Sequence, residues 1–417
     1  MPSCILKPGK ERRLMSGHPW VYAGEIAKFT GDPADGDVVD IRDHKDRPHG
    51  SGLLNRKSQI TVRQFTAGKE ELDRTFFRKR IEAAIAYRKT VCGSALPGAT
   101  GLTAVGGQGD RAQKGAPTIV SDSYRLVFSE ADQLPGLIVD KFGDDIVFQA
   151  LTLGIDKRKG TFIEILRDVF KPASIIERSD VPTRRLEGLA EAKCVVYGKY
   201  EGNSVITVGG VKFEGNLLED QKTGFFLDQA ENYAIVASHC AGKKVLDCFS
   251  YHGGFGLFAA KAGATRVEAV ESSEPANARA RRNAGVNGLD SKLEFNCANV
   301  FDVLKAYDKE KRQFDVIILD PPTFTRTKQN VDDALRGYKE INLRALKMLA
   351  PGGLLATFSC SHHIDGELLK AVIVAAAADA HKLVRLVKVL TQSPDHPILL
   401  AVPETEYLKG YLVQVVG

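Results

Sequence analysis

The sequence contains no C-x-x-C motif and no long apolar run, and each absence excludes a class of protein. Its seven cysteines are odd in number, which argues against a disulfide framework, and their spacing matches no zinc site. None of its apolar runs approaches the roughly 20 residues that a membrane span needs. The first residues, MPSCILKPGKERR, also lack the apolar core of a signal peptide. We therefore expect a cytoplasmic protein with reduced thiols, no metal and no membrane segment.

Positive charge is not in large excess, but it is unevenly placed. The net charge is +5 over 417 residues. Residues 1–95 hold 18 Lys and Arg against 12 Asp and Glu, so this surplus of 6 accounts for the basic balance of the chain. Such a segment suggests a phosphate-rich partner, although an ordinary basic surface would give the same count. The length predicts two or three domains with ample core.

The first 66 residues predict a small β-rich domain, because short alternating runs are separated by Gly, Asp and Pro turns. Near Trp20 and Tyr22 stand four cations, Lys7, Lys10, Arg12 and Arg13. Cations beside aromatics suit RNA, whose bases stack and whose phosphates attract positive charge. A solvated rim around a buried tryptophan is the alternative, and we expect Trp20 itself to lie in the core.

Residues 70–198 are expected to connect this domain to the rest of the chain. Glu70–Val91 predicts an amphipathic helix whose basic residues, Arg88 among them, lie mostly off the apolar face in solvent. Residues 93–117, rich in Gly, Ala and Pro, predict a loop or an insertion. Residues 118–198 follow the pattern strand, strand, helix, strand, strand. They show no nucleophile beside a base, so we assign no chemistry to them.

The chain is organised around one βαβ unit at residues 242–275. A first apolar strand is interrupted by Asp247 near its carboxyl end, and a glycine turn leads into a run of helix formers. A second strand ends on Glu271. This order is typical of a doubly wound sheet, which binds its ligand at the carboxyl ends of the strands. An acid in the position of Glu271 suits the two hydroxyls of a ribose.

The glycine turn lacks the G-x-G-x-x-G spacing of a dinucleotide site, since its order is Gly253-Gly254-Phe255-Gly256. Glycines let backbone approach a ligand without a Cβ in the way. With Asp247 before the turn and Glu271 after it, the pattern favours S-adenosylmethionine over a nicotinamide dinucleotide. A packing βαβ unit with chance glycines is the alternative.

Asn299, Asp320 and Cys360 each follow a further predicted strand. Because the carboxyl ends of neighbouring strands converge on one crevice, we expect these three residues to meet Asp247 and Glu271 there. The amide of Asn299 offers a donor and an acceptor to an adenine edge, or is a plain turn residue.

Two methylation reactions fit Asp320-Pro321-Pro322 and Cys360. In the first, the Cys360 thiolate adds to C6 of a pyrimidine and makes C5 nucleophilic, while Asp320 holds N3 and the exocyclic amine. In the second, the acid-Pro-Pro turn grips an exocyclic amine, such as guanine N2, and an aromatic stacks on the base. Phe324 is displaced by one residue through Thr323, which weakens the second reading, and Cys360 would then be an ordinary buried cysteine.

Taken together, these motifs resemble the RlmI-like family of bacterial class I methyltransferases, which form 5-methylcytosine in 23S ribosomal RNA. The resemblance spans nearly the whole chain, and the stretches that carry it are LKPGKERRLMSGHPWVYAGEI, EADQLPGLIVDKFGD, ERSDVPTRRLEGL, LLEDQKTGFFLDQ, VLDCFSYHGGFGLFAAKAGA, DPPTFTRTK, ALRGYKEINLRALKMLAPGG, FSCSHHI, PDHP and PETEYLKG. It implies an α/β fold with a Rossmann-like, seven-stranded methyltransferase domain, an N-terminal β-rich PUA domain and a small central α+β domain.

The resemblance implies four segments: a PUA-like RNA-binding domain at 1–68, a helical connector and loop at 69–117, a central β-β-α-β-β domain at 118–198, and the methyltransferase domain at 199–417. It implies Cys360 as nucleophile and Asp320 as the acid of the fourth motif. We expect eight residues to contact the cofactor: Asp247, Phe249, Gly253, Gly254, Glu271, Ser272, Asn299 and Asp320. Of these, Phe249 and Ser272 are neighbours of the motif positions. Lys10, Arg12 and Arg13 are the expected RNA contacts.

The chain departs from the family's pattern at Asn299, where an Asp is usual, and at 93–117, which looks like an insertion. The two-cysteine RNA cytosine methyltransferases carry a second cysteine beside the Pro-Pro turn. This chain lacks that cysteine, and so does the family that it resembles. The expected partner is ribosomal RNA, and a homodimer is allowed. Two alternatives stay open: methylation of an exocyclic amine by the same fold, and a non-catalytic RNA-binding ribosome-assembly factor.

Overall fold

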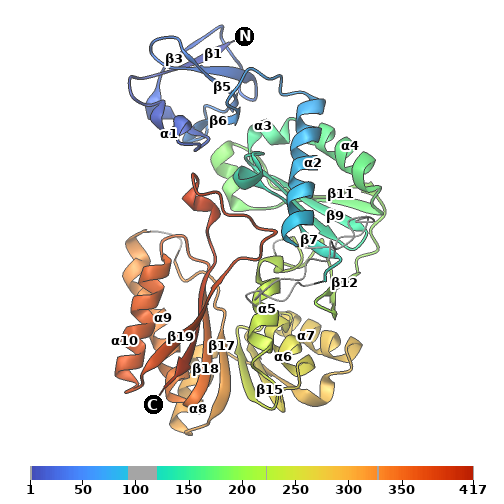
Figure 1. Ribbon diagram of the computed structural model, residues 1–417. Coiled ribbons are helices and arrows are strands. Elements are labelled where there is room, and N and C mark those ends of the chain that lie inside the picture. Colours follow the sequence, from blue (N-terminus) through green and yellow to red (C-terminus); the bar gives the residue numbers. More distant parts are fainter. Residues whose placement is uncertain (1, 93–119, 222, 326–327, 417) are drawn as a thin grey trace, which may run out of the picture.

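Four β-sheets organise the residues that the computed structural model describes, which are 2–92, 120–221, 223–325 and 328–416 (Figure 1). A six-stranded sheet lies at the N-terminal end of the molecule, a five-stranded sheet in the middle, and a seven-stranded sheet at the other end. The predicted loop at 93–117 lies outside the described residues. No helix in the described ranges is both long enough and apolar enough to cross a bilayer.

The N-terminal sheet has the strand order β2-β6-β5-β4-β1-β3 and carries the short helix α1 (Arg12–Met15). Its strands are β1 (Ser3–Leu6), β2 (Trp20–Tyr22), β3 (Ile26–Thr30), β4 (Val38–Arg42), β5 (Pro48–Leu54) and β6 (Ile60–Thr66). A small apolar core that includes Leu6, Ile41 and Leu54 fills it. The β-rich domain expected from the short alternating runs is therefore present.

The central sheet has one strand more than the sequence pattern predicted. Its order is β11-β10-β9-β8-β7, and its elements are β7 (Ser123–Phe128), β8 (Leu137–Phe142), β9 (Asp145–Ala150), α3 (Leu153–Asp156), α4 (Lys159–Phe170), β10 (Ser174–Ser179) and β11 (Ala192–Gly198). The strand missed is β8, whose apolar run is broken by Asp140. That carboxylate is fully buried and accepts two hydrogen bonds from Arg125, at 2.8 Å each. Because a charged residue is unusual inside a buried strand, the pattern of apolar residues did not predict β8.

Helix α2 (Arg74–Val91) packs on the central sheet with Phe76, Phe77 and Ile81 buried. It begins after Asp73, whose carboxylate caps the backbone N–H of Phe76 at 2.8 Å. Arg88, expected in solvent, is fully buried, and this part of the prediction was wrong. Its guanidinium pairs with Asp132 and donates to the carbonyl of Asp395 at 2.8 Å, so internal acceptors replace water around the charge.

The seven-stranded sheet confirms the predicted doubly wound α/β domain. Its order is β16-β15-β14-β17-β18-β20-β19, parallel except for β20 and β19. The strands are β14 (Lys244–Cys248), β15 (Arg266–Glu271), β16 (Leu293–Cys297), β17 (Phe314–Leu319), β18 (Leu349–Ser359), β19 (Val384–Thr391) and β20 (Lys409–Val415). The hairpin β12 (Ser204–Val208) and β13 (Val211–Gly215) precedes it.

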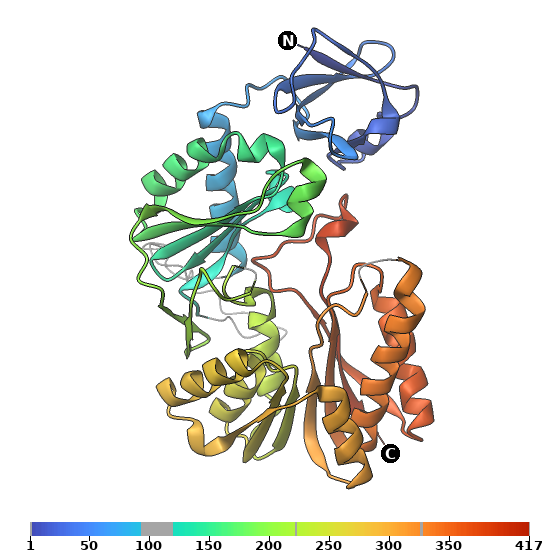
Figure 2. The same ribbon diagram turned by 180° about the vertical axis from the view of Figure 1, so that it is seen from behind.

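Helices cover both faces of this sheet (Figures 1 and 2). One apolar layer joins the sheet to α5 (Ala230–Ala237), α6 (Gly254–Lys261) and α7 (Glu274–Val286). A second layer joins it to α8 (Val300–Lys309), α9 (Val331–Lys347) and α10 (Gly366–Asp379). Between β19 and β20, residues 392–408 rise from the sheet toward the other two units (Figures 1 and 2).

Candidate active site

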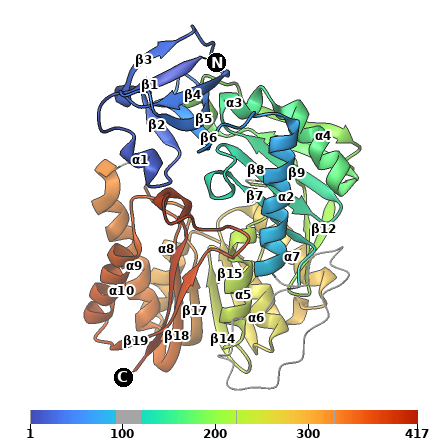
Figure 3. The same cartoon turned by 45° about the horizontal axis from the view of Figure 1, so that its top comes forward.

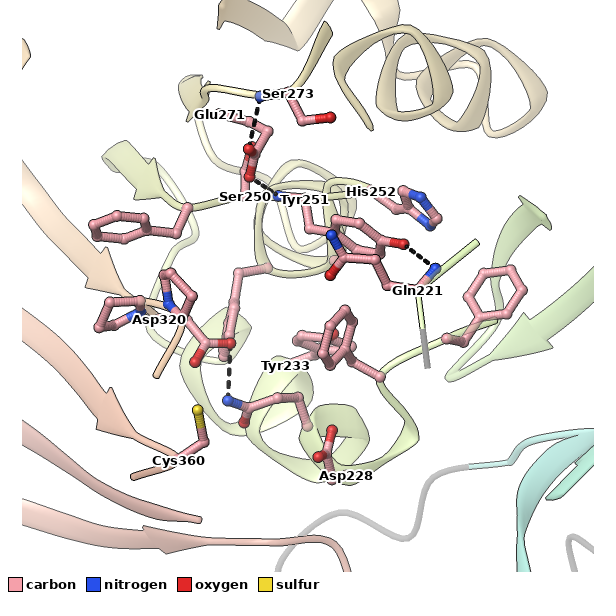
Figure 4. Close-up of a pocket in the computed structure, with 18 of the residues that line it drawn as sticks. Gln221, Asp228, Tyr233, Ser250, Tyr251, His252, Glu271, Ser273, Asp320 and Cys360 are labelled. Carbon is pink, nitrogen blue, oxygen red and sulfur yellow. Dashed lines mark hydrogen bonds between the residues drawn. The ribbon is translucent and has the colours of Figure 1, made fainter. Parts of the chain in front are cut away.

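A cavity of about 700 Å³ opens at the carboxyl ends of β14, β15, β17 and β18, where the βαβ unit predicted a ligand. Its wall is completed by the segment before α5 that holds Gln221, Asp228 and Gln229 (Figure 4). Among the predicted residues, those that line it are Phe249, Gly254, Glu271, Ser272, Asn299, Asp320 and Cys360. The structure therefore brings most of the predicted site together.

The turn between β14 and α6 has an unusual backbone. Phe249 and Tyr251 have positive φ angles of 61° and 46°, which non-glycine residues rarely adopt, and Gly253 has a φ of 83°. Asp247 ties the end of β14 to the start of α6, because its Oδ2 accepts the backbone N–H of Gly256 at 2.8 Å. Strained backbone held by a buried carboxylate is typical of a binding site.

Gly254 lines the cavity and also has a packing reason to lack a side chain. A Cβ on Gly254 would lie 2.5 Å from the ring of Tyr233, so the missing side chain lets an aromatic residue of α5 pack against the start of α6. Tyr233 itself lines the cavity. The close approach is therefore between two parts of the protein, and it shapes the cavity wall.

Glu271 and Asn299 are both anchored by backbone groups. The Glu271 carboxylate accepts the N–H of Tyr251 at 3.1 Å and that of Ser273 at 2.9 Å (Figure 4). The Asn299 Oδ1 accepts the N–H of Phe301 at 2.9 Å and so caps α8. Both side chains are thus held in fixed positions at the cavity edge.

The electrostatics of the cavity favour a cation. Asp247 is buried, and its Oδ1 has no hydrogen-bond partner among the described residues. Burial, together with the nearby charges of Asp320 and Glu271, raises the pKa of Asp247 to about 8. A positively charged ligand would relieve this clustering of acids. S-adenosylmethionine carries a sulfonium and an ammonium group, so the residues present fit it.

Cys360 and Asp320 both line the cavity, at the ends of the paired strands β18 and β17 (Figure 4). The Sγ of half-buried Cys360 lies 3.1 Å from the Oγ1 of Thr323. The Oδ2 of Asp320 accepts a hydrogen bond from Gln229 Nε2 at 2.9 Å. Phe324 also lines the cavity, and its ring packs on Tyr338 with centroids 4.6 Å apart.

Sequence reasoning missed the second layer of polar groups around these two residues. Gln229 and Asn232 lie behind Asp320. Near Cys360, the Nζ of Lys409 donates to the carbonyls of Ser361 and Tyr407 at 3.0 Å each, and burial lowers the pKa of this lysine. The stretches LLEDQKTGFFLDQ and PETEYLKG contain Gln229 and Lys409. They carried the family resemblance, but no periodicity or spacing gave these residues a role.

The N-terminal cations lie apart from the cavity. Lys10 and Arg12 are exposed, whereas Arg13 pairs with Glu25 at 3.5 Å and lies over the Tyr22 ring at 4.6 Å. Trp20 is half-buried, so its expected place in the core was wrong: its Nε1–H donates to Glu130 of the central unit at 2.9 Å.

The N-terminal unit also meets the segment between β19 and β20 (Figure 3). The Nε2 of His18 lies 3.3 Å from the Oε2 of Glu404 in that segment. The same segment ends on Leu408, which lines the cavity. One segment therefore contacts both the N-terminal unit and the candidate active site.

Comparisons with known proteins agree with this geometry. Residues 4–67 match the model of a PUA-like domain, and residues 191–406 match that of an S-adenosylmethionine-dependent methyltransferase. The chain is 41% identical over 414 residues to the ribosomal RNA large subunit methyltransferase I of Shewanella denitrificans, covering 98% of each chain. It is 39% identical over 412 residues to the protein of the same name from Pseudoalteromonas atlantica, again covering 98% of each.

Two solved structures share the whole fold. A methyltransferase complexed with SAH superposes with a TM-score of 0.81, at 20% identity and with all of both chains covered. A SAM-dependent methyltransferase from Streptococcus mutans gives a TM-score of 0.79 at the same identity and coverage. With the family models and the curated relatives, these findings show that the chain belongs to the ribosomal RNA large subunit methyltransferase I family of S-adenosylmethionine-dependent methyltransferases.

Proposed function

We propose that this protein methylates C5 of a cytosine in 23S ribosomal RNA through a covalent adduct at Cys360. The observation that carries the proposal is the meeting of Cys360 and Asp320 in one cavity, which Glu271 also lines and beside which Asp247 is buried. The names of the relatives support RNA of the large ribosomal subunit as the substrate.

The cofactor end of the cavity would hold S-adenosylmethionine. Glu271 and Ser272 take the ribose, Asn299 takes the adenine edge through its amide nitrogen, and ionised Asp247 balances the positive charge, with Asp320 as a further polar contact. Phe249, Gly253 and Gly254 form the turn that lies against it. When bound, the cofactor supplies an electrophilic methyl group on a sulfonium.

Cys360 and Asp320 perform the chemistry on the base. The Cys360 thiolate forms a bond to C6, and the electron pair of the C5–C6 double bond makes C5 nucleophilic toward the methyl group. Asp320 holds the exocyclic amine and N3 and gives N3 the proton that neutralises the ring. After C5 has gained the methyl group, its proton passes to water, the C6–sulfur bond breaks, and the N3 proton returns to Asp320.

The alternatives have less support. Methylation of an exocyclic amine needs an aromatic residue that stacks on the base. Phe324 lines the cavity, but it is displaced by one residue through Thr323 and its ring already packs against Tyr338 and, at 5.8 Å, Phe301. A non-catalytic assembly factor would not need Glu271, Asp320 and Cys360 to line one cavity.

We assign RNA capture to residues 1–68, with Lys10, Arg12 and Arg13 as phosphate contacts. Of the predicted connector at 69–117, the described part holds α2, which packs on the central domain at 118–198, and we assign residues 199–417 to the methyltransferase domain. The exposure of Lys10 and Arg12 supports a phosphate contact, because a solvated cation can release counterions from RNA.

Nucleoside mass spectrometry tests the function directly. Ribosomal RNA from cells with and without the gene would be digested and compared, and one 5-methylcytosine in 23S RNA should disappear with the gene. Loss of an N-methylated guanosine instead would support the amine alternative. RNA with no lost modification would support the assembly factor.

A further inference from the structure

Two buried side-chain amides lie in line behind Asp320. Gln229 and Asn232 are 2% and 1% exposed and belong to the one-turn helix η5 (Leu227–Gln229) and to α5. The Nε2 of Gln229 lies 2.9 Å from Asp320 Oδ2, and the Nδ2 of Asn232 lies 2.6 Å from Gln229 Oε1. The same Nδ2 lies 2.9 Å from the backbone carbonyl oxygen of Thr391.

The direction of these hydrogen bonds is fixed at the Thr391 end. A backbone carbonyl can only accept, so Asn232 must turn its NH₂ group toward it. That NH₂ group has a second hydrogen, which it donates to Gln229 Oε1. Gln229 must then present its own NH₂ group to Asp320, and Asp320 Oδ2 must accept. A single orientation of both amides therefore satisfies all three hydrogen bonds.

We propose that Gln229 and Asn232 are positioning residues that reserve Asp320 Oδ2 as a hydrogen-bond acceptor, so that the catalytic proton of Asp320 is carried on Oδ1. This rests on the proposed function, in which Asp320 passes one proton to N3 of the cytosine and later takes it back. A proton on Oδ2 would make that oxygen a weaker acceptor for the Gln229 N–H, whereas a proton on Oδ1 leaves the hydrogen bond intact. The relay thus keeps the proton on a single oxygen and holds the carboxyl group in one rotation.

Reversing the polarity of the relay tests this without touching Asp320. In Asn232→Asp, an ionised carboxylate can only accept, so Gln229 turns its NH₂ group toward residue 232 and its carbonyl toward Asp320. Asp320 Oδ2 then needs the proton that belongs on Oδ1. We expect single-turnover methyl transfer to fall about tenfold or more, because general acid catalysis contributes roughly 10²–10⁴-fold. Covalent trapping on RNA that carries 5-fluorocytidine should fall in parallel, whereas the Kd for S-adenosylhomocysteine should stay within about threefold.

Two controls separate positioning from folding. Asn342→Asp makes the same change at a fully buried amide that donates to the carbonyl of Tyr338 at 2.8 Å, and it should leave the rate near the wild-type value. Gln229→Leu removes the donor without adding charge and should slow the reaction with little effect on S-adenosylhomocysteine binding. It replaces Asn232→Asp if that variant does not fold.

A double-mutant cycle decides the matter. In the Asp320→Asn background, an amide at position 320 can offer either an acceptor or a donor to Gln229, so Asn232→Asp should slow the reaction no further. The relay would be refuted if Asn232→Asp and Gln229→Leu kept near wild-type rates, or if Asn232→Asp cost the same factor in both backgrounds. A fast Asp320→Asn or Cys360→Ala enzyme would instead overturn the proposed function itself.

Discussion

The Sγ of Cys360 and the Oγ1 of Thr323 lie 3.1 Å apart, so the turn that follows Asp320 is tied to the strand that delivers the thiol. This contact gives the expected nucleophile a hydroxyl neighbour that the sequence did not assign. It also means that a small change in the Asp-Pro-Pro turn reaches Cys360 directly.

Cys360→Ala should abolish methyl transfer and leave folding and cofactor binding nearly intact. Removing one half-buried sulfur disturbs packing far less than the large-to-small core changes that cost about 2–5 kcal/mol. RNA carrying 5-fluorocytidine should trap the wild-type protein but not the variant, since fluorine blocks the elimination at C5. Cys194→Ala, at an exposed cysteine, is the matched control. An active Cys360→Ala enzyme would rule out the covalent mechanism.

Thr323→Val should make Cys360 less reactive. Valine keeps the shape of the side chain but cannot donate to a thiolate, and a hydrogen bond to the charged form stabilises that form. The pH at which iodoacetamide alkylates Cys360 half-maximally should therefore move upward. Mass spectrometry of the modified peptide measures it. An unchanged profile would mean that the thiol donates to the hydroxyl rather than the reverse.

Asp247→Asn should stabilise the unliganded protein and weaken cofactor binding. The pKa of Asp247 is raised to about 8 in the folded state. The folded state therefore binds more protons than the unfolded state between about pH 4 and pH 8, and stability falls as pH rises through that window. A neutral amide removes this loss, so the Tm at pH 8 should rise by about 2 °C or more.

The same substitution should lower the affinity for the cofactor, although it stabilises the unliganded protein. A cationic ligand favours ionised Asp247, so S-adenosylmethionine affinity of the wild type should increase from pH 6 to pH 8 and then level off, with proton release on binding. Calorimetry in two buffers of different ionisation enthalpy measures the release. The Asn variant should bind more weakly and release fewer protons. Equal proton release by both proteins would contradict the assignment to Asp247.

Neutralising Lys10 and Arg12 should weaken RNA binding and flatten its salt dependence. Each lost phosphate contact removes roughly 0.7–0.9 from the slope of log affinity against log salt. The structure separates Arg13, because it is already held by Glu25 and Tyr22 and should contribute less to the slope. Lys309→Gln on α8, an exposed cation of the methyltransferase domain, is the control. A slope unchanged by the double substitution would show that these cations only coat the surface.

Arg88→Met should destabilise the protein by about 3–5 kcal/mol, the cost of leaving one partner of a buried ion pair uncompensated. The partner is Asp132, and the same guanidinium holds the Asp395 carbonyl. Denaturant titration measures the loss. Lys89→Met, one residue along the helix and exposed, should change stability little.

Patterns of apolar residues predicted a doubly wound sheet, since period and glycine position are local properties, and the family resemblance implied its seven strands. The same patterns predicted that Glu271, Asn299, Asp320 and Cys360 converge, because the ends of parallel strands meet. These patterns could not predict features that depend on residues far away in the sequence. Arg88 looks like any surface cation until Asp132 and Asp395 are beside it, and β8 does not look like a strand until Arg125 neutralises Asp140.

The residues of the candidate site also divide into those that local sequence predicts and those that depend on distant residues. Cys360 and Asp320 follow strands and were predictable, whereas Gln229 and Asn232 matter only because Thr391, about 160 residues later in the chain, supplies the carbonyl that orients them. Trp20 was expected in the core for its size, but its indole N–H makes it a link between two units.

The segment between β19 and β20 also constrains the order in which the chain matures. Within the described residues, β19 joins the sheet only through β20, and Arg88 must wait for a carbonyl 307 positions further along. During synthesis, α2 therefore emerges with a guanidinium whose final acceptors do not yet exist. Contacts of such long sequence separation form late. We expect the three units to associate late in folding, after this segment has left the ribosome. Methyltransferase activity should therefore appear at that step and not when the earlier sheets form.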